Sequence, residues 1–202
     1  MLLKVKKLEL KTCRLLSKLP VFSISRVLLF VFIFPNFLWA KVDLVQVVEK
    51  LQYPWAMDFL PGKEALVTEK PGRLQKVNLE TGEKTEIQNL PEVHAVGQGG
   101  LLDVMVHPDF KQNQKIFLTF SAPLNASGDA TTTLISARLE GQQLSDQKIL
   151  FQADPALPGG HHFGSRVRMA QDGMLYFSVG ERGRMKEAQD PQNHLGTVIR
   201  LQ

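Results

Sequence analysis

Two polar residues stand where folding of the chain could bring them together, His162 and Glu181. Residues 166–170 and 175–179 alternate as strands do, and the Gln171-Asp172-Gly173 between them is typical of a hairpin turn. His162 precedes the first strand and Glu181 follows the second, so an antiparallel hairpin would place them at the same end. A carboxylate orients an imidazole and raises its basicity, as a general base near neutral pH requires.

A second candidate is Gln98, in the run Gly97-Gln98-Gly99-Gly100. Glycines on both sides let the backbone approach a ligand closely, and the Gln98 amide can both donate and accept hydrogen bonds. A turn with a solvated glutamine is the alternative interpretation, and the spacing alone leaves it open.

The polar segment after residue 179 also holds the basic residues Arg182, Arg184 and Lys186. They could hold an anion, although an exposed charged loop accounts for them equally well. His161 and His162 have no Glu, Asp or Cys at a recognised zinc spacing, so the sequence does not favour a zinc site. It also contains no Gly-Lys-Ser/Thr phosphate loop and no Gly-x-Ser-x-Gly nucleophile turn.

The predicted strands around these residues form a unit that occurs three times. Each unit is a strand, a tight turn, a second strand, a connection and a third strand, without a long amphipathic helix. This repetition predicts an all-β fold, a β-propeller of which three blades are present; a β-sandwich is the alternative. The predicted strands are residues 55–60, 65–69 and 73–79, then 101–106, 116–121 and 131–139, then 166–170, 175–179 and 196–201.

Residues 43–51 add a strand of the kind that closes a propeller ring. Propellers usually have about four to eight blades, so three do not make a ring. We therefore expect this chain to be an incomplete form of its fold.

The charge is distributed unevenly. The net charge of the 202 residues is +4, but the first 26 contain seven Lys or Arg and one Glu, which leaves −2 for the rest. A mildly acidic body gives no electrostatic argument for nucleic acid as a partner.

The basic segment is followed by eight apolar residues, 27–34, and by the small-residue end Leu38-Trp39-Ala40. This order predicts a signal peptide over residues 1–40, a mature domain over 41–202 and a periplasmic or secreted location. An uncleaved membrane anchor is the alternative, but a spanning helix needs roughly 20 apolar residues, so we expect no stable membrane span after cleavage. The single cysteine, Cys13, lies in the leader, so the mature domain would have neither disulfides nor thiol chemistry.

Five groups of motifs, in order along the chain, resemble the soluble aldose sugar dehydrogenases of the glucose/sorbosone dehydrogenase family. Each motif is short, but the resemblance runs over nearly all of residues 51–201. The motifs are residues 53–60, residues 97–104 with 107–110, residues 162–166, residues 180–183, and residues 188–190 with 194–196.

The resemblance implies a six-bladed propeller that uses pyrroloquinoline quinone (PQQ) to oxidise aldose sugars at the anomeric carbon to lactones. His162 matches the family's general base, and Glu181 matches the acid that supports it. Gln98 matches a glutamine that contacts cofactor and substrate. His161 stands where the family's glucose dehydrogenases have an acid, so its role is open.

The resemblance also implies that some residues of the site lie outside these 202 residues. The calcium ligands and the remaining PQQ contacts are expected after residue 202, so no metal ligand is assigned here. The implied partners are an aldose substrate and an external electron acceptor, and we expect the 202-residue chain alone to be inactive. The alternative function is that of a non-catalytic exported propeller that binds carbohydrate or protein.

Overall fold

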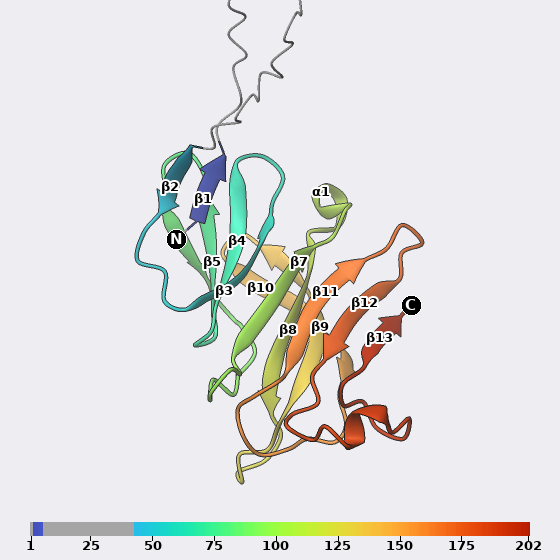
Figure 1. Ribbon diagram of the computed structural model, residues 1–202. Helices are drawn as coiled ribbons and strands as arrows, with labels where there is room; N and C mark the ends of the chain where they lie inside the picture. The colour runs from blue at the N-terminus through green and yellow to red at the C-terminus, as the bar shows by residue number, and fades with distance from the viewer. Residues whose placement is uncertain (1, 6–42) are drawn as a thin grey trace, which may run out of the picture. The chain divides into compact units, whose positions relative to one another are not determined.

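Three antiparallel sheets make up most of the chain that the computed structural model describes, which is residues 2–5 and 43–202 (Figure 1). Strands that are consecutive in the chain are neighbours within each sheet. The first sheet consists of Pro54–Phe59 (β3), Glu64–Glu69 (β4), Arg73–Asn78 (β5) and Lys84–Ile87 (β6). The second consists of Leu101–Val106 (β7), Lys115–Pro123 (β8), Ala130–Glu140 (β9) and Gln143–Gln152 (β10). The third consists of Gly164–Met169 (β11), Leu175–Val179 (β12) and Val198–Leu201 (β13).

The other described elements are short. Leu2–Val5 (β1) and Leu44–Val48 (β2) pair with each other. The helical elements are Phe110–Asn113 (α1) and a 3-10 turn at Glu187–Gln189. None of the described helices has the length and apolar character needed to cross a bilayer. Apart from residues 2–5, the predicted leader lies outside the described residues.

The threefold repetition predicted from the sequence is confirmed, but two strands were missed. The sequence prediction assigns no strand to residues 84–87 or 143–152, where the structure has the outer strands β6 and β10. The β10 strand lies at the edge of its sheet, is mostly exposed and contains two register shifts. An exposed, irregular strand needs no apolar alternation, so its sequence carries little of the period-2 signal.

Apolar side chains fill the space between successive sheets. Leu66 and Leu74 of the first sheet share one core with Leu118 of the second. Phe117 of the second shares another core with Phe177 of the third. The middle sheet is therefore covered on both faces, which explains why β8 is buried almost from end to end. Face-to-face packing of successive small sheets is the arrangement of β-propeller blades.

The first strands of the three blades, β3, β7 and β11, are neighbours. Each has a register irregularity near its start, where a main-chain N–H is released from the ladder. In each blade a hydroxyl of the second strand accepts that N–H. The three pairs are Ala56 N–H to Thr68 Oγ1 at 3.0 Å, Asp103 N–H to Thr119 Oγ1 at 3.0 Å and Ser165 N–H to Ser178 Oγ at 3.2 Å.

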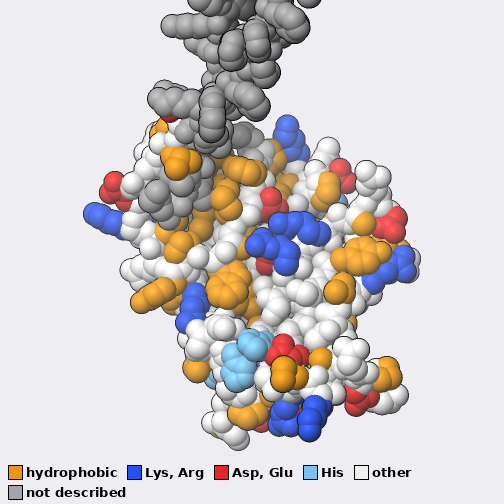
Figure 2. Space-filling model, viewed as in Figure 1, with side chains coloured by type: hydrophobic (Ala, Val, Ile, Leu, Met, Phe, Trp, Pro, Cys, Tyr) orange, Lys and Arg blue, Asp and Glu red, His pale blue; other side chains and the backbone are white. Residues whose placement is uncertain are grey.

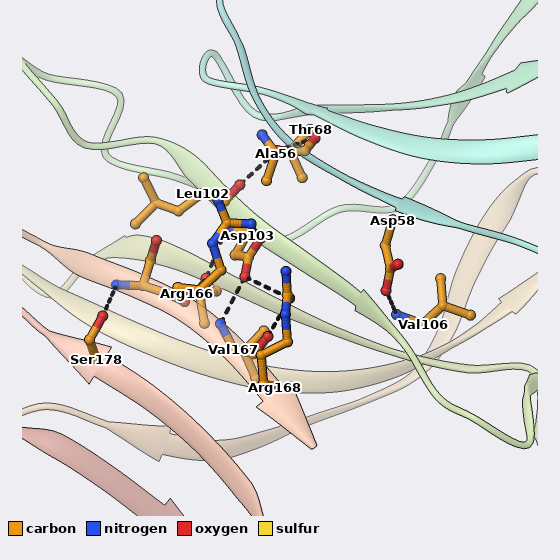
Figure 3. Close-up of polar contacts among 12 residues, drawn as sticks. Ala56, Asp58, Thr68, Leu102, Asp103, Val106, Arg166, Val167, Arg168 and Ser178 are labelled. Carbon is orange, nitrogen blue, oxygen red and sulfur yellow. Dashed lines mark hydrogen bonds and ion pairs between the residues drawn. The ribbon is translucent and has the colours of Figure 1, made fainter. Parts of the chain in front are cut away.

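Two of these hydroxyls also link one blade to the next, and Figure 3 labels one such pair, Thr68 and Leu102. Thr68 Oγ1 donates to the carbonyl of Leu102 at 2.6 Å, and Thr119 Oγ1 donates to the carbonyl of Ser165 at 3.0 Å. Both threonines are fully buried. A single side chain thus satisfies a bulge in its own blade and a carbonyl in the neighbouring blade.

The carboxylates of Asp58, which is partly buried, and Asp103, which is buried, make a second set of links between the first strands. Asp58 accepts the N–H of Val106, and Asp103 accepts the N–H of Val167, each at 2.7 Å. Burial raises the pKa of Asp103 above the ordinary value, although the Val167 N–H and the nearby guanidinium groups of Arg166 and Arg168 act in the opposite direction. These polar links fix how one blade is placed against the next.

Candidate active site

The His162 ring and the Glu181 carboxylate are in direct contact through Nδ1 and Oε1. The cause is local: Gly164 pairs with Val179 in the β11–β12 hairpin, and the two functional residues lie two positions beyond that pair. The main chains of Gly180 and His162 also lie close together, and a Cβ atom at Gly180 would collide with the His162 carbonyl. The contact predicted from the hairpin is therefore present, while the catalytic roles of the two residues remain a prediction.

This pairing decides which ring nitrogen of His162 is free. The hydrogen bond from His162 is the main cause that holds the pKa of Glu181 below its ordinary value, so the carboxylate is ionised at neutral pH. An ionised carboxylate only accepts, so Nδ1 carries the hydrogen and the lone pair of the neutral ring is on Nε2. Within the described residues Nε2 has no hydrogen-bond partner, and the side chain is half exposed. Figure 2 shows histidine side chains beside acidic atoms on the surface of the face that it presents.

Gln98 reaches the same place from the connection between β6 and β7. Its Oε1 atom accepts the main-chain N–H of His162 at 2.9 Å. A Cβ atom at Gly97 would overlap the carbonyl of Gly160, so glycine is needed for the two loops to approach. The side-chain Nε2 of Gln98 has no protein partner in the described part of the chain, which leaves one donor for a ligand.

His161 lies against the proposed base. The two histidine rings meet edge to face, with 5.1 Å between centroids and 84° between planes. A side chain at Gly183 would collide with the ring of His161. The sequence assigned no role to His161, and in the structure its ring packs against the ring of His162.

Arg182 departs from both interpretations that the sequence allowed. It is neither an exposed loop residue nor free to hold an anion, because its side chain is 5% exposed and donates to main-chain carbonyls. Arg184 and Lys186 are exposed, and Arg184 pairs with Glu187 at 3.0 Å. No local signal could have revealed the burial of Arg182, since its partners come from positions 130 to 161.

A family model described as Glucose / Sorbosone dehydrogenase matches residues 51–202. The match includes all three blades and every residue of the candidate site. The chain belongs to the glucose/sorbosone dehydrogenase family.

Individual relatives agree with this assignment. The aldose sugar dehydrogenase YliI of Escherichia coli is 35% identical over 170 residues, which are 81% of this chain and 46% of that protein. The apo-form crystal structure of the E. coli soluble aldose sugar dehydrogenase matches with a TM-score of 0.73 and 35% identity, over 77% of this chain and 45% of that one. The PQQ-bound aldose sugar dehydrogenase of Streptomyces coelicolor matches with a TM-score of 0.66 and 28% identity, over 77% and 46%. The chain thus spans about half the length of the relatives that it matches.

Two side-chain atoms of the site suit contacts with a quinone cofactor and its sugar substrate. Gln98 Nε2 and His162 Nε2 have no hydrogen-bond partner among the described residues; Gln98 Nε2 can donate to a quinone or sugar oxygen, and His162 Nε2 can accept from a sugar hydroxyl. The described residues contain no group of three His, Cys, Asp or Glu that could hold a metal. No calcium ligand is therefore assigned in this part of the chain.

Proposed function

We propose that this chain carries the proton-accepting end of a PQQ-dependent dehydrogenase that oxidises aldose sugars at the anomeric carbon. The observation that carries the proposal is the His162–Glu181 pair with its free Nε2 atom. The aldose sugar dehydrogenase from E. coli and the PQQ-bound enzyme from S. coelicolor support the substrate class and the cofactor.

In the proposed reaction His162 Nε2 takes the proton of the anomeric hydroxyl, and the C1–O bond becomes a carbonyl as a hydride leaves C1. Bound PQQ supplies the acceptor for that hydride. The Glu181 carboxylate stabilises the imidazolium that forms and keeps the Nδ1 hydrogen in place. Gln98 fixes the main chain of His162 through Oε1 and offers Nε2 to the cofactor or sugar.

Because this chain spans about half the length of its relatives, the test uses an enzyme of the relatives' length. This chain would be joined to the part of the E. coli protein that the match leaves out, and loaded with PQQ and calcium. Turnover of several aldoses would be measured with an artificial electron acceptor. We expect His162→Gln to lower kcat by about 10² to 10⁴, the usual contribution of a general base.

Binding of PQQ is the control readout in this experiment. Its affinity, followed by absorbance, should change little in His162→Gln, because most contacts of the cofactor are expected after residue 202. Near-normal turnover of every sugar would remove His162 from the mechanism. Binding of sugar without any oxidation by the wild-type chimera would instead favour a non-catalytic carbohydrate-binding propeller.

The domain organisation and location belong to the same proposal. Residues 1–40 are proposed to be a cleaved leader and residues 41–202 the exported part, in the periplasm or outside the cell. An external electron acceptor is then required to reoxidise the cofactor, and the isolated 202-residue chain is expected to be inactive.

A further inference from the structure

Arg182 is a buried cation held by main-chain carbonyls. It follows Glu181 directly, and like His162 it has a left-handed main chain, with φ of 55° against 52°. No carboxylate pairs with Arg182 among the described residues. Its four hydrogen bonds are from Nε to His161 O at 2.9 Å, from Nη1 to Ala130 O at 2.6 Å, and from Nη2 to Gly159 O at 2.8 Å and Leu157 O at 3.1 Å.

Packing alone does not explain why a charged side chain is buried at this position. Burial disfavours the charged form, and it lowers the pKa of Arg182 from its ordinary value. A buried charge without a counter-ion is costly, and an apolar residue of similar size could fill the space more cheaply. What only a guanidinium supplies is a rigid fork of several donors, which can hold several carbonyls of one loop at fixed positions.

The carbonyls that Arg182 holds belong to the loop that leads to His162. Three of them, at Leu157, Gly159 and His161, lie on this loop, and the fourth, at Ala130, lies at the first residue of β9. The guanidinium also lies over the Phe163 ring, 3.8 Å from its centroid. Arg182 therefore contacts the residue before and the residue after His162.

We propose that Arg182 is a positioning residue that fixes the main chain on both sides of His162, so that the imidazole meets the Glu181 carboxylate. Two consecutive residues then position the proposed base: Glu181 orients the ring of His162, and Arg182 anchors the loop that carries His162. The geometric part of this proposal stands on the contacts alone, and its consequence for catalysis rests on the proposed function.

The first test uses the 202-residue chain and needs no cofactor. Arg182→Lys keeps a positive charge and loses the fork. We expect the loop to relax and the ring to leave Glu181, so the pKa of Glu181, measured by carboxyl carbon NMR, should rise toward its ordinary value. Arg73→Lys is the matched control, because Arg73 binds Glu69 and Gln52 in the first blade. It should leave the Glu181 titration unchanged.

Two further measurements separate positioning from general stabilisation. Thr68→Val weakens the chain at the link between the first two blades, where Thr68 hydrogen-bonds to Ala56 and Leu102 and not to Arg182 or Glu181, and should leave the Glu181 titration unchanged. In the wild type, the Arg182 Nε–H should exchange slowly with solvent and show scalar coupling to the His161 carbonyl carbon. This observation tests the anchor even if Arg182→Lys fails to fold.

An unchanged Glu181 titration in folded Arg182→Lys would overturn the proposal, and so would rapid exchange of the wild-type Nε–H. In the chimera with the E. coli segment, Arg182→Lys should lower kcat by about tenfold to a hundredfold with little change in KM, as small misplacements of a catalytic group do. If His162→Gln keeps its turnover while Arg182→Lys still shifts Glu181, the proposed function fails and the positioning role stands.

Discussion

The side-chain Oε1 of Gln98 accepts the main-chain N–H of His162 at 2.9 Å, across 64 residues of sequence. The proposed base is thus held from three directions: its amide by Gln98, its ring by Glu181, and its neighbours in the chain by Arg182. This arrangement makes the site sensitive to residues that would never touch the transferred proton.

Gln98→Ala should lower stability and turnover together. It removes the acceptor of the His162 N–H, and a typical hydrogen bond contributes about 0.5–1.5 kcal/mol to the free energy of unfolding. Urea unfolding of the 202-residue chain measures this loss. Gln142→Ala is the matched control, because that exposed glutamine has no side-chain partner among the described residues and should be neutral.

Gln98→Glu separates the two ends of the Gln98 amide. It keeps an oxygen acceptor for His162 and removes the Nε2 donor. Stability should therefore stay close to that of the wild type, while the affinity for PQQ, measured by absorbance titration of the chimera, should fall. Equal affinities in Gln98→Glu and the wild type would show that Nε2 does not contact the cofactor.

The pH dependence of the free energy of unfolding should reveal the contribution of the His162–Glu181 pair. Because the pKa of Glu181 is lower in the folded chain than its ordinary value of 4.5, its contribution is present above that value. The contribution is lost as the pH falls through the folded pKa, where the carboxylate gains a proton. Urea midpoints of the wild type and Glu181→Gln should therefore differ more at pH 7 than at pH 3. A constant difference would contradict this assignment.

Thr68→Val should destabilise the contact between the first two blades. The valine leaves two buried groups unpaired, the N–H of Ala56 and the carbonyl of Leu102, at a cost of about 1–3 kcal/mol each. Chemical unfolding gives the value. Ser145→Ala is an informative control, since the Ser145 hydroxyl is buried without a partner and its removal should be neutral or stabilising.

Export can be tested without the enzyme. A fusion of residues 1–45 to a reporter that is active only in the periplasm should be secreted and cut near Ala40. Val31→Arg, which interrupts the apolar run, should keep the fusion in the cytoplasm. Cytoplasmic retention of the unmodified fusion would show that the leader interpretation is wrong.

The first three strands of each blade, and the contact of His162 with Glu181, could be predicted from local sequence patterns. These features depend on short-range causes: period-2 alternation, turn residues, and a single hairpin whose two ends must coincide. The family motifs added the candidate role of Gln98, although no pattern in the sequence predicted its contact with His162.

Tertiary structure alone decided the remainder. The strands β6 and β10 lie at the edges of their sheets and each pairs with one neighbour only, and their own residues carry little pattern. Arg182 has the sequence context of a solvated loop, yet it is buried because carbonyls from distant positions converge on it. The hydroxyl links of Thr68 and Thr119 likewise exist only where one blade is packed on the next. Contacts between segments far apart in the chain depend on how the blades stack, and local propensity contains no information about that packing.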